Sequence, residues 1–360
     1  MMKPAIRALV SLLIVVLCSQ CQKNTEPEPI VTIKDDNFLH ILLNMGADKD
    51  GDGRINKTEA ELVTDLCLNA SSISDMSGIE AFVNLKFLRC GWNMITRLDV
   101  TNNTALIHLE CPSNKLTNLD VTGNTALENL YCSDNLLTTL DVSNNASLEM
   151  LNCSSNKLTK LDISNNNLLT ALSCGDNQLT SLDVSNLEFL THLECYINQL
   201  ITLDISNNQA LEILWCSTNQ LSTLDLSNNV ALVRLWCYEN LLTSLDVSNC
   251  HALDWLSCGS NQLSCLDLSN NAGLKNLSCG NNLLTSLDIT KNTALNWLEC
   301  GSNQIVNLDL SLNTALEILS FTFMPSLYEV CVWTMPFPPD EIDLEINSSP
   351  NVAFTADCSN

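Results

Sequence analysis

The sequence predicts a mainly β solenoid of short stacked units, with a small α-helical cap at its N-terminal end. From Phe87 to Leu319, nearly the same pattern returns every 21 residues. A cysteine marks each copy, from Cys90 to Cys300, and an asparagine follows it three residues later. A strict period of this length is typical of a repeat architecture, whose extended face favours binding over catalysis.

Each unit reads LxxLxCxxNxLTxLDxSxNxA and contains one short strand. Leu109 and Cys111 alternate with Glu110, so the two apolar residues point to one side of the strand and the glutamate to the other. Stacked copies place these strands side by side in a parallel sheet, about 4.8 Å apart. We expect the repeated asparagine to bond backbone groups at the turn after the strand. The LTxLD segment predicts extended chain or a second short strand on the opposite side.

This pattern resembles the leucine-rich repeat family, LxxLxLxxNxL, with Cys in place of the third Leu. The resemblance covers about three quarters of the chain. It implies a right-handed solenoid whose parallel sheet lines a concave face, with extended or short β segments on the convex face. An earlier unit, Leu66 to Leu88, resembles the 22-residue repeats of internalins. We therefore predict a solenoid over residues 66–324 and a C-terminal cap over 325–360, because Phe321 and Met324 replace the repeated Cys and Asn.

Most of the 18 cysteines belong to the repeats. Equivalent residues in adjacent coils face the same way at an apolar position, which predicts a ladder of buried free thiols; pairing between some neighbours and metal binding are the alternatives. Cys67 is predicted to have the same core role in the first coil. Cys250 and Cys265 lie outside the ladder, and whether they pair is left open. Cys331 and Cys358 are predicted to form a terminal disulfide, with two free thiols as the alternative.

Residues 1–21 have the features of an export signal: two basic residues followed by the apolar run Leu9 to Leu17. A cysteine at the end of this run resembles a bacterial lipoprotein signal, which implies acylation of Cys21, with Cys18 as the other acceptor. Simple secretion is the alternative. Residues 22–33 are predicted to be a linker. The predicted location is the bacterial cell surface or outer membrane as a lipoprotein, or the medium, with membrane contact only through the lipid anchor.

The segment from Asp48 to Glu59, DKDGDGRINKTE, resembles the calcium loop of the EF-hand family. The resemblance implies calcium as a cofactor, held by oxygen ligands from Asp48, Asp50, Asp52, the Arg54 carbonyl, Asn56 and Glu59. Residues 34–66 are thus predicted to be a helical cap over the first coil. A metal-free acidic turn is the alternative. Since no second loop follows, we expect a structural site and not a switch.

The net charge of −25 argues against nucleic acids and anionic membrane surfaces as partners. Enzymatic activity is not predicted. His108 and His192 lie four coils apart, near 19 Å by strand spacing, and neither accompanies a nucleophile motif. The chain is predicted to be a monomeric, non-enzymatic binding protein.

Variable strand positions on the concave side carry most of the tryptophans, and aromatic side chains are enriched at binding hot spots. The predicted ligand-binding residues are Tyr196, Ile213, Trp215, Arg234, Trp236, Tyr238, Trp255 and Trp297. We expect an exposed aromatic patch in which Arg234 orients an acidic group of the ligand. The alternative is that these large side chains only cover neighbouring strands. The expected partner is a protein or peptide in an adhesion or adaptor role, and a glycan is the other candidate.

Overall fold

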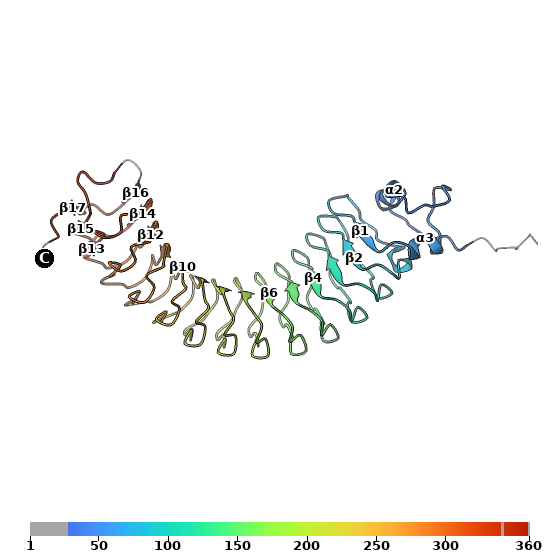
Figure 1. Cartoon of the computed structure of the whole chain (residues 1–360), viewed down its shortest axis with the longest axis horizontal. Helices are drawn as coiled ribbons and strands as arrows, with labels where there is room; N and C mark the ends of the chain where they lie inside the picture. Colours follow the sequence, from blue (N-terminus) through green and yellow to red (C-terminus); the bar gives the residue numbers. More distant parts are fainter. Residues whose placement is uncertain (1–27, 340–341, 359–360) are drawn as a thin grey trace, which may run out of the picture.

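The computed structural model describes residues 28–339 and 342–358, and these form an arc of stacked coils (Figure 1). A parallel sheet of 14 strands lines the inner side of the arc, and the connecting loops lie on the outer side. The strands of this sheet are β1 Asp65–Cys67, β2 Phe87–Arg89, β3 His108–Glu110, β4 Asn129–Tyr131, β5 Met150–Asn152, β6 Ala171–Ser173, β7 His192–Glu194, β8 Ile213–Trp215, β9 Arg234–Trp236, β10 Trp255–Ser257, β11 Asn276–Ser278, β12 Trp297–Glu299, β14 Ile318–Ser320 and β16 Asp343–Glu345.

The strands stack in a single register, because the coils from β2 to β14 all have the same length of 21 residues. Leu193 lies opposite Leu214, which in turn lies opposite Leu235. These central leucines are fully buried, whereas the residues on either side of them point to the concave surface. The predicted mainly β leucine-rich repeat solenoid is confirmed, as is the alternation of apolar and polar faces.

The repeated asparagines connect each coil to the coil before it. The side-chain amide of Asn177 donates to the carbonyls of Cys153 and Cys174, both at 3.1 Å, and its oxygen accepts from the Leu158 amide at 2.9 Å. The asparagine side chain thus pairs with backbone groups that the buried turn would otherwise leave without a hydrogen-bond partner. The predicted role of this asparagine is confirmed.

A second asparagine ladder lies on the far side of each coil and was not predicted. Asn145 is fully buried and donates to the carbonyls of Val121, at 3.0 Å, and Asn124, at 2.8 Å. The same pair of bonds recurs at Asn166 and, further along, at Asn208. In both ladders the asparagine amide donates hydrogen bonds to backbone carbonyls that water cannot reach.

The convex side is only partly as predicted. A three-stranded sheet forms at the C-terminal end, from β13 Asn307–Asp309, β15 Glu329–Cys331 and β17 Ala353–Thr355. In the earlier coils the LTxLD segment forms no strand. Its aspartate instead closes a local turn, as where Ser143 donates through its amide and hydroxyl to Asp141. These side-chain bonds compete with a strand ladder for the backbone amides.

Two helices cover the open end of the first coil: α2 Asp36–Asn44 and α3 Lys57–Glu61. The Phe38 ring of α2 lies 6.2 Å from the Phe82 ring, next to the short 3-10 helix η1 Ile79–Ala81. Asp35 caps α2 with one carboxylate oxygen, and its other oxygen accepts from the amides of Ser74 and Asp75. The apolar end of the solenoid is thus covered.

The predicted linker ends earlier than residue 33. Ile30 forms an antiparallel bridge with Asn56, and the Val31 amide donates to the Ile55 carbonyl at 2.8 Å. All four residues from Ile30 to Ile33 are β-branched, which favours extended pairing. This segment therefore belongs to the cap.

The C-terminal boundary at residue 324 is also too early. Strand β16 pairs with β14 and extends the concave sheet, while β15 and β17 extend the convex one. Phe321 takes the place of the repeated cysteine without breaking the stack, since its ring is fully buried and its amide donates to Glu345. Within residues 28–339 and 342–358, no helix has the length and apolar character needed to cross a bilayer.

Candidate recognition face and calcium loop

Five aromatic rings follow one another along the middle of the concave face. We name this set the aromatic ladder; its members are Tyr196, Trp215, Trp236, Trp255 and Trp297. Their ring centroids lie 4.2, 5.9, 5.9 and 5.3 Å apart in that order. The last three separations are within the range of favourable aromatic pairs, and the first is slightly shorter. The structure therefore brings together residues from coils more than 100 positions apart in the chain.

The register of the sheet explains this contact. Trp215 and Trp236 are direct partners on β8 and β9, while Trp255 on β10 pairs with Arg234 and reaches Trp236 diagonally. Strand β11 carries only Asn276 at the next position, so Trp255 meets Trp297 across it. A small side chain between two large ones lets the ladder skip a strand.

A glycine makes room at the start of the ladder. A Cβ atom at Gly175 would lie 2.5 Å from the Tyr196 ring, closer than any side chain tolerates. Tyr196 therefore lies flat over the preceding coil and stacks on Trp215 with an interplanar angle of 26°. Neither residue alone signals this arrangement in the sequence.

The expected exposed patch is in fact half-buried. All five rings of the aromatic ladder have intermediate exposure, because each covers part of its neighbour. The indole nitrogen of Trp215 is buried without a hydrogen-bond partner among the described residues. Ile213 and Tyr238 are also half-buried beside the ladder, and Arg234 is exposed. The eight residues predicted for ligand binding thus share one face.

Charged groups surround the aromatic ladder. Glu194 lies opposite Trp215 in the strand register, and Glu299 follows on β12. Glu239, exposed at the rim, accepts a hydrogen bond from the Thr218 hydroxyl at 2.9 Å. The Arg234 guanidinium lies 3.9 Å from the Asp254 carboxylate. The cation expected to orient an acidic ligand is therefore already next to an anion of this protein.

A second aromatic group occupies the N-terminal part of the same face and was not predicted. The rings of Phe87, His108 and Tyr131 lie on β2, β3 and β4, with centroids 6.3 and 5.5 Å apart. The Glu110 carboxylate lies 3.6 Å from the His108 ring nitrogen. All three residues stand at variable strand positions, so the repeat pattern already indicated that they lie on the concave face. The prediction was instead based on the positions of the tryptophans.

The predicted calcium loop folds around its own carboxylates. Asp48 accepts from the amides of Gly51 and Gly53, at 2.7 and 2.9 Å. Glu59 is almost fully buried and accepts from the amides of Lys49 and Asn56. These bonds hold carboxylate oxygens inward from both ends of the loop.

Three of the predicted metal ligands meet: oxygen atoms of Asp48, Asp50 and Glu59 lie within 4.8 Å of one another. The Asp52 carboxylate is outside this group and accepts instead from the Arg54 amide at 2.8 Å. The Asp52 amide donates to Asp50 and lowers its pKa, but desolvation and the adjacent negative charges outweigh this bond and raise the pKa overall. A hard divalent cation suits such a set of crowded oxygens.

The repeat cysteines form a continuous ladder in the core. All eleven, from Cys90 to Cys300, are fully buried and unpaired. Burial raises the pKa of Cys153 to about 12, so the thiol is neutral at physiological pH. The prediction of buried free thiols agrees with this arrangement, and pairing between neighbours is not found.

Three more cysteines lie outside the ladder: Cys67, which was predicted to be in the core, and Cys250 and Cys265, whose pairing was left open. Cys67 is exposed, because Leu68 occupies the ladder position and donates to the Arg89 carbonyl as Cys90 donates to Glu110. The prediction of a core role for Cys67 is therefore wrong by one residue of register, which turns a strand side chain to the other face. Cys250 is buried in the second asparagine ladder, whereas Cys265 is exposed; the two are unpaired.

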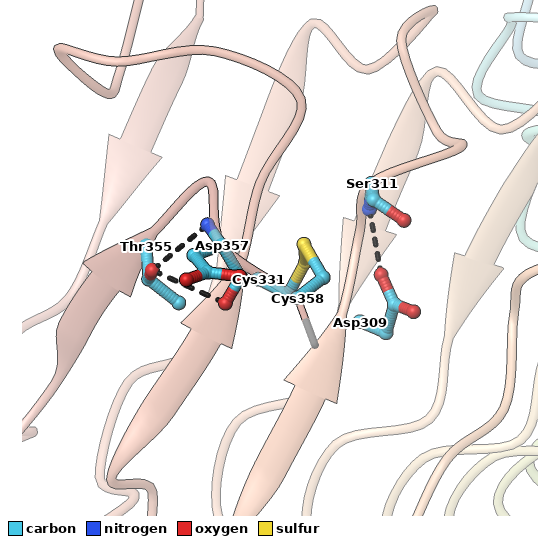
Figure 2. Close-up of a disulfide and its surroundings, with 6 residues drawn as sticks. All are labelled: Asp309, Ser311, Cys331, Thr355, Asp357 and Cys358. Carbon is cyan, nitrogen blue, oxygen red and sulfur yellow. Dashed lines mark hydrogen bonds between the residues drawn. A yellow bond between two sulfur atoms is a disulfide. The ribbon is translucent and has the colours of Figure 1, made fainter. Parts of the chain in front are cut away.

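A disulfide joins Cys331 of β15 to Cys358 near the C-terminus, with the Cα atoms 5.6 Å apart (Figure 2). The Asp309 carboxylate lies close to both sulfur atoms and accepts from the Ser311 amide. Disulfide sulfurs are not thiolates, and only thiolates bind metals well, so this cluster is not a metal site. The predicted acylation site at Cys21 lies outside the described residues.

Comparison with known proteins gives results for structures only. A scan against protein-family models gave no match, and neither did a search of curated proteins. Among solved structures, the chain is similar to the functional domain of InlJ from Listeria monocytogenes, which includes a cysteine ladder. The identity is 38%, the TM-score is 0.82, and the match covers 89% of this chain and 70% of that one.

Two further structures share the fold. An internalin, InlF, from Listeria monocytogenes is 23% identical with a TM-score of 0.68, covering 89% of this chain and 100% of that one. A leucine-rich repeat protein of Leptospira interrogans is 22% identical with a TM-score of 0.69, covering 82% and 81%. Together with the parallel sheet, the similarity to InlJ shows that the chain belongs to the internalin-like family of bacterial leucine-rich repeat proteins, and its repeat cysteines form a ladder as those of InlJ do.

Proposed function

We propose that this chain is a non-enzymatic recognition protein of the bacterial cell surface that binds a protein partner on its concave face. The observation that carries the proposal is the aromatic ladder, five rings held in mutual contact by five coils. Internalin-like proteins of this fold are typically binding proteins, which supports the same conclusion.

The ladder is suited to binding because its rings are already ordered. Each ring packs against the next, so little side-chain entropy remains to be lost when a partner covers them. Large aromatic side chains also bury much area on contact and are frequent hot spots. The half-buried state of the rings thus lowers the cost of binding and leaves an apolar strip for the partner.

A protein partner suits this surface better than a glycan. A sugar ring stacks on the open face of an aromatic ring, but Tyr196 and Trp215 cover one face of each other at 4.2 Å. A protein segment can instead follow the edges of the rings along the arc.

The test uses partners captured by the purified chain from host and bacterial surface proteins. For each partner, the dissociation constant is measured for wild type, Trp236→Ala and Lys160→Ala. We expect Trp236→Ala to weaken binding by about 2 kcal/mol. Lys160 lies beside Asp162 on the convex side, so Lys160→Ala serves as the control and should change nothing. Equal affinities of the two variants would place the binding site elsewhere.

We further propose that the loop from Asp48 to Glu59 binds one calcium ion that stabilises the N-terminal cap. Asp48, Asp50 and Glu59 already converge, and Asp52, Asn56 and the Arg54 carbonyl are the remaining oxygen donors. An ion there would join the end of α2 to the start of α3 and so brace the cap against the first coil.

Calorimetric titration of the chain with calcium tests this site. Calcium should raise the melting temperature, and Glu59→Gln should remove that effect. Glu61→Gln is the matched control, since Glu61 lies in the same helix but forms only a surface pair with Lys57 at 3.7 Å. No heat of binding at millimolar calcium would refute the calcium proposal.

Lipid attachment at Cys21 is the proposed means of surface anchoring. Mass spectrometry of the protein from bacterial membranes would detect acylation, and Cys21→Ser should release the protein to the medium. If Cys18→Ser releases it instead, the acceptor is Cys18; release by neither variant would refute lipid anchoring.

A further inference from the structure

The charges around the aromatic ladder point to the chemistry of its partner. We propose that the ladder recognises a basic protein segment, whose Lys or Arg side chains lie along the rings and reach the surrounding carboxylates. This inference rests on the proposed function, since it concerns the same concave face, and it names the kind of partner.

Two carboxylates bracket the central rings within one row of the sheet. The row holds the residue before each repeat cysteine, and it reads Glu194, Trp215, Trp236, Ser257, Ser278 and Glu299 from β7 to β12. By strand spacing, Glu194 lies about 5 Å from the Trp215 position, and Glu299 about 14 Å from the Trp236 position. A side chain lying over Trp215 can therefore reach Glu194. Glu299 is instead in reach of a side chain lying over Trp297, two residues before it on the same face of β12.

These carboxylates are positioned by hydroxyl groups and not by cations. The Ser173 hydroxyl donates to Glu194 at 3.0 Å. The Ser278 hydroxyl donates to Glu299 at 2.7 Å, and the Gly280 amide donates to the same oxygen at 3.3 Å. A Cβ atom on Gly280 would overlap the Glu299 carboxylate, so glycine is required for this placement. Neither glutamate forms an ion pair with any residue in the part of the chain that the structure describes.

The one guanidinium beside the central rings is already matched. Arg234 lies 3.9 Å from Asp254, whereas Glu194, Glu239 and Glu299 form no ion pair within residues 28–339 and 342–358. An acidic partner would meet these three negative charges and be repelled. A basic partner gains their attraction at the rim and the apolar strip at the centre.

Lys and Arg side chains suit this combination of groups. Their methylene stems pack on apolar surface while the charged end stays at the edge, in reach of a carboxylate. A guanidinium is also attracted by an indole face that is not stacked, as at Trp236, which is tilted by 44° and 41° against Trp215 and Trp255. The concave face offers both interactions within a single side chain's length.

Selection from a library of random linear peptides, displayed on phage and applied to the purified chain, tests the inference. Peptides are counter-selected on the double variant Trp215→Leu/Trp236→Leu, which keeps every charge. We expect the surviving peptides to be rich in Lys and Arg. Synthetic copies should bind about tenfold more weakly to the double variant, as for the loss of aromatic hot-spot contacts.

Charge is tested separately with the double variant Glu194→Gln/Glu299→Gln, which keeps every ring. It should weaken the same peptides several-fold, whereas Glu188→Gln, an exposed site outside the sheet, should not. Circular dichroism and melting temperature confirm that each variant is folded; the single variant Trp236→Leu replaces the double tryptophan variant if that one is not.

The outcomes separate the two proposals. Ladder-dependent peptides that are neutral or acidic, and insensitive to the glutamate variant, would overturn the basic partner and leave the recognition face in place. Basic peptides that bind the tryptophan variant as well as wild type would show only general attraction to a chain of charge −25, and would overturn the inference. If the selection yields no peptide whose binding depends on the ladder, both proposals are contradicted.

Discussion

Replacing Cys174 by serine tests the cysteine ladder most directly. Cys174 is fully buried, and serine nearly preserves its shape while adding a polar hydroxyl. The nearest carbonyls are already occupied: that of Cys174 accepts from Asn177 and Asn198, both at 3.1 Å. The carbonyl of Cys153 likewise accepts from two asparagine amides. The new hydroxyl therefore finds neither of these carbonyls free.

Burying a hydroxyl without a partner costs about 1–3 kcal/mol. Cys174→Ala is the matched control, because it removes one buried atom without adding a polar group and should cost about 1 kcal/mol through the small void. If polarity dominates, serine must be the more harmful substitution, although it fills the space better. If packing dominates, the order reverses.

Native-state hydrogen exchange followed by mass spectrometry is the suitable assay, because coils in a solenoid interact only with their neighbours. Amides in the coils around residues 153–195 should exchange roughly 5- to 150-fold faster in Cys174→Ser. Amides near Cys300 should be unchanged and give the internal control. A serine variant as protected as wild type, or less harmed than the alanine variant, would refute the argument. Disulfides between neighbouring repeat cysteines would refute the free-thiol ladder itself.

Three further outcomes are expected. Cys250→Asn should stabilise the chain by about 1 kcal/mol in urea unfolding, because it restores two amide bonds to the second asparagine ladder; a less stable variant would show that the thiol packs better than the amide. Ile197 has a φ of +47° and is exposed, so Ile197→Asn should also stabilise by about 1 kcal/mol, and no gain would mean that the turn carries no strain. The hydroxyl and then the amide of Thr122 lower the pKa of Asp120, as happens at most repeat aspartates. Stability from these bonds is present above the ordinary value of 3.8 and is lost as the pH falls through the lower folded pKa, so the melting temperature in calorimetry should drop below about pH 4. A melting temperature that stays constant below about pH 4 would contradict this contribution of the aspartates to stability.

Strict repetition made most of the fold predictable from the sequence. The 21-residue period predicted the in-register sheet. The alternation of Leu109, Glu110 and Cys111 predicted which strand residues are buried and which lie on the concave face. The aromatic positions were readable for the same reason, since a residue's place in the repeat sets its face. Where the repetition weakens, the predictions lost accuracy: Cys67 was placed one residue out of register, and the segment after Met324 was not recognised as a continuing coil.

The sequence by itself determined which side chains share a face, because a 21-residue period places equivalent residues one strand apart. Only the tertiary structure decided what those side chains do to one another. Tyr196 lies flat because Gly175 leaves room, Trp255 meets Trp297 because Asn276 is small, and Arg234 lies beside Asp254. These contacts depend on the sizes and orientations of neighbours in adjacent coils, which a repeat pattern does not encode. The packing of neighbouring side chains, and not the repeat period, therefore decides that the aromatic rings are half-buried and that the carboxylates near them have no ion-pair partner among the described residues.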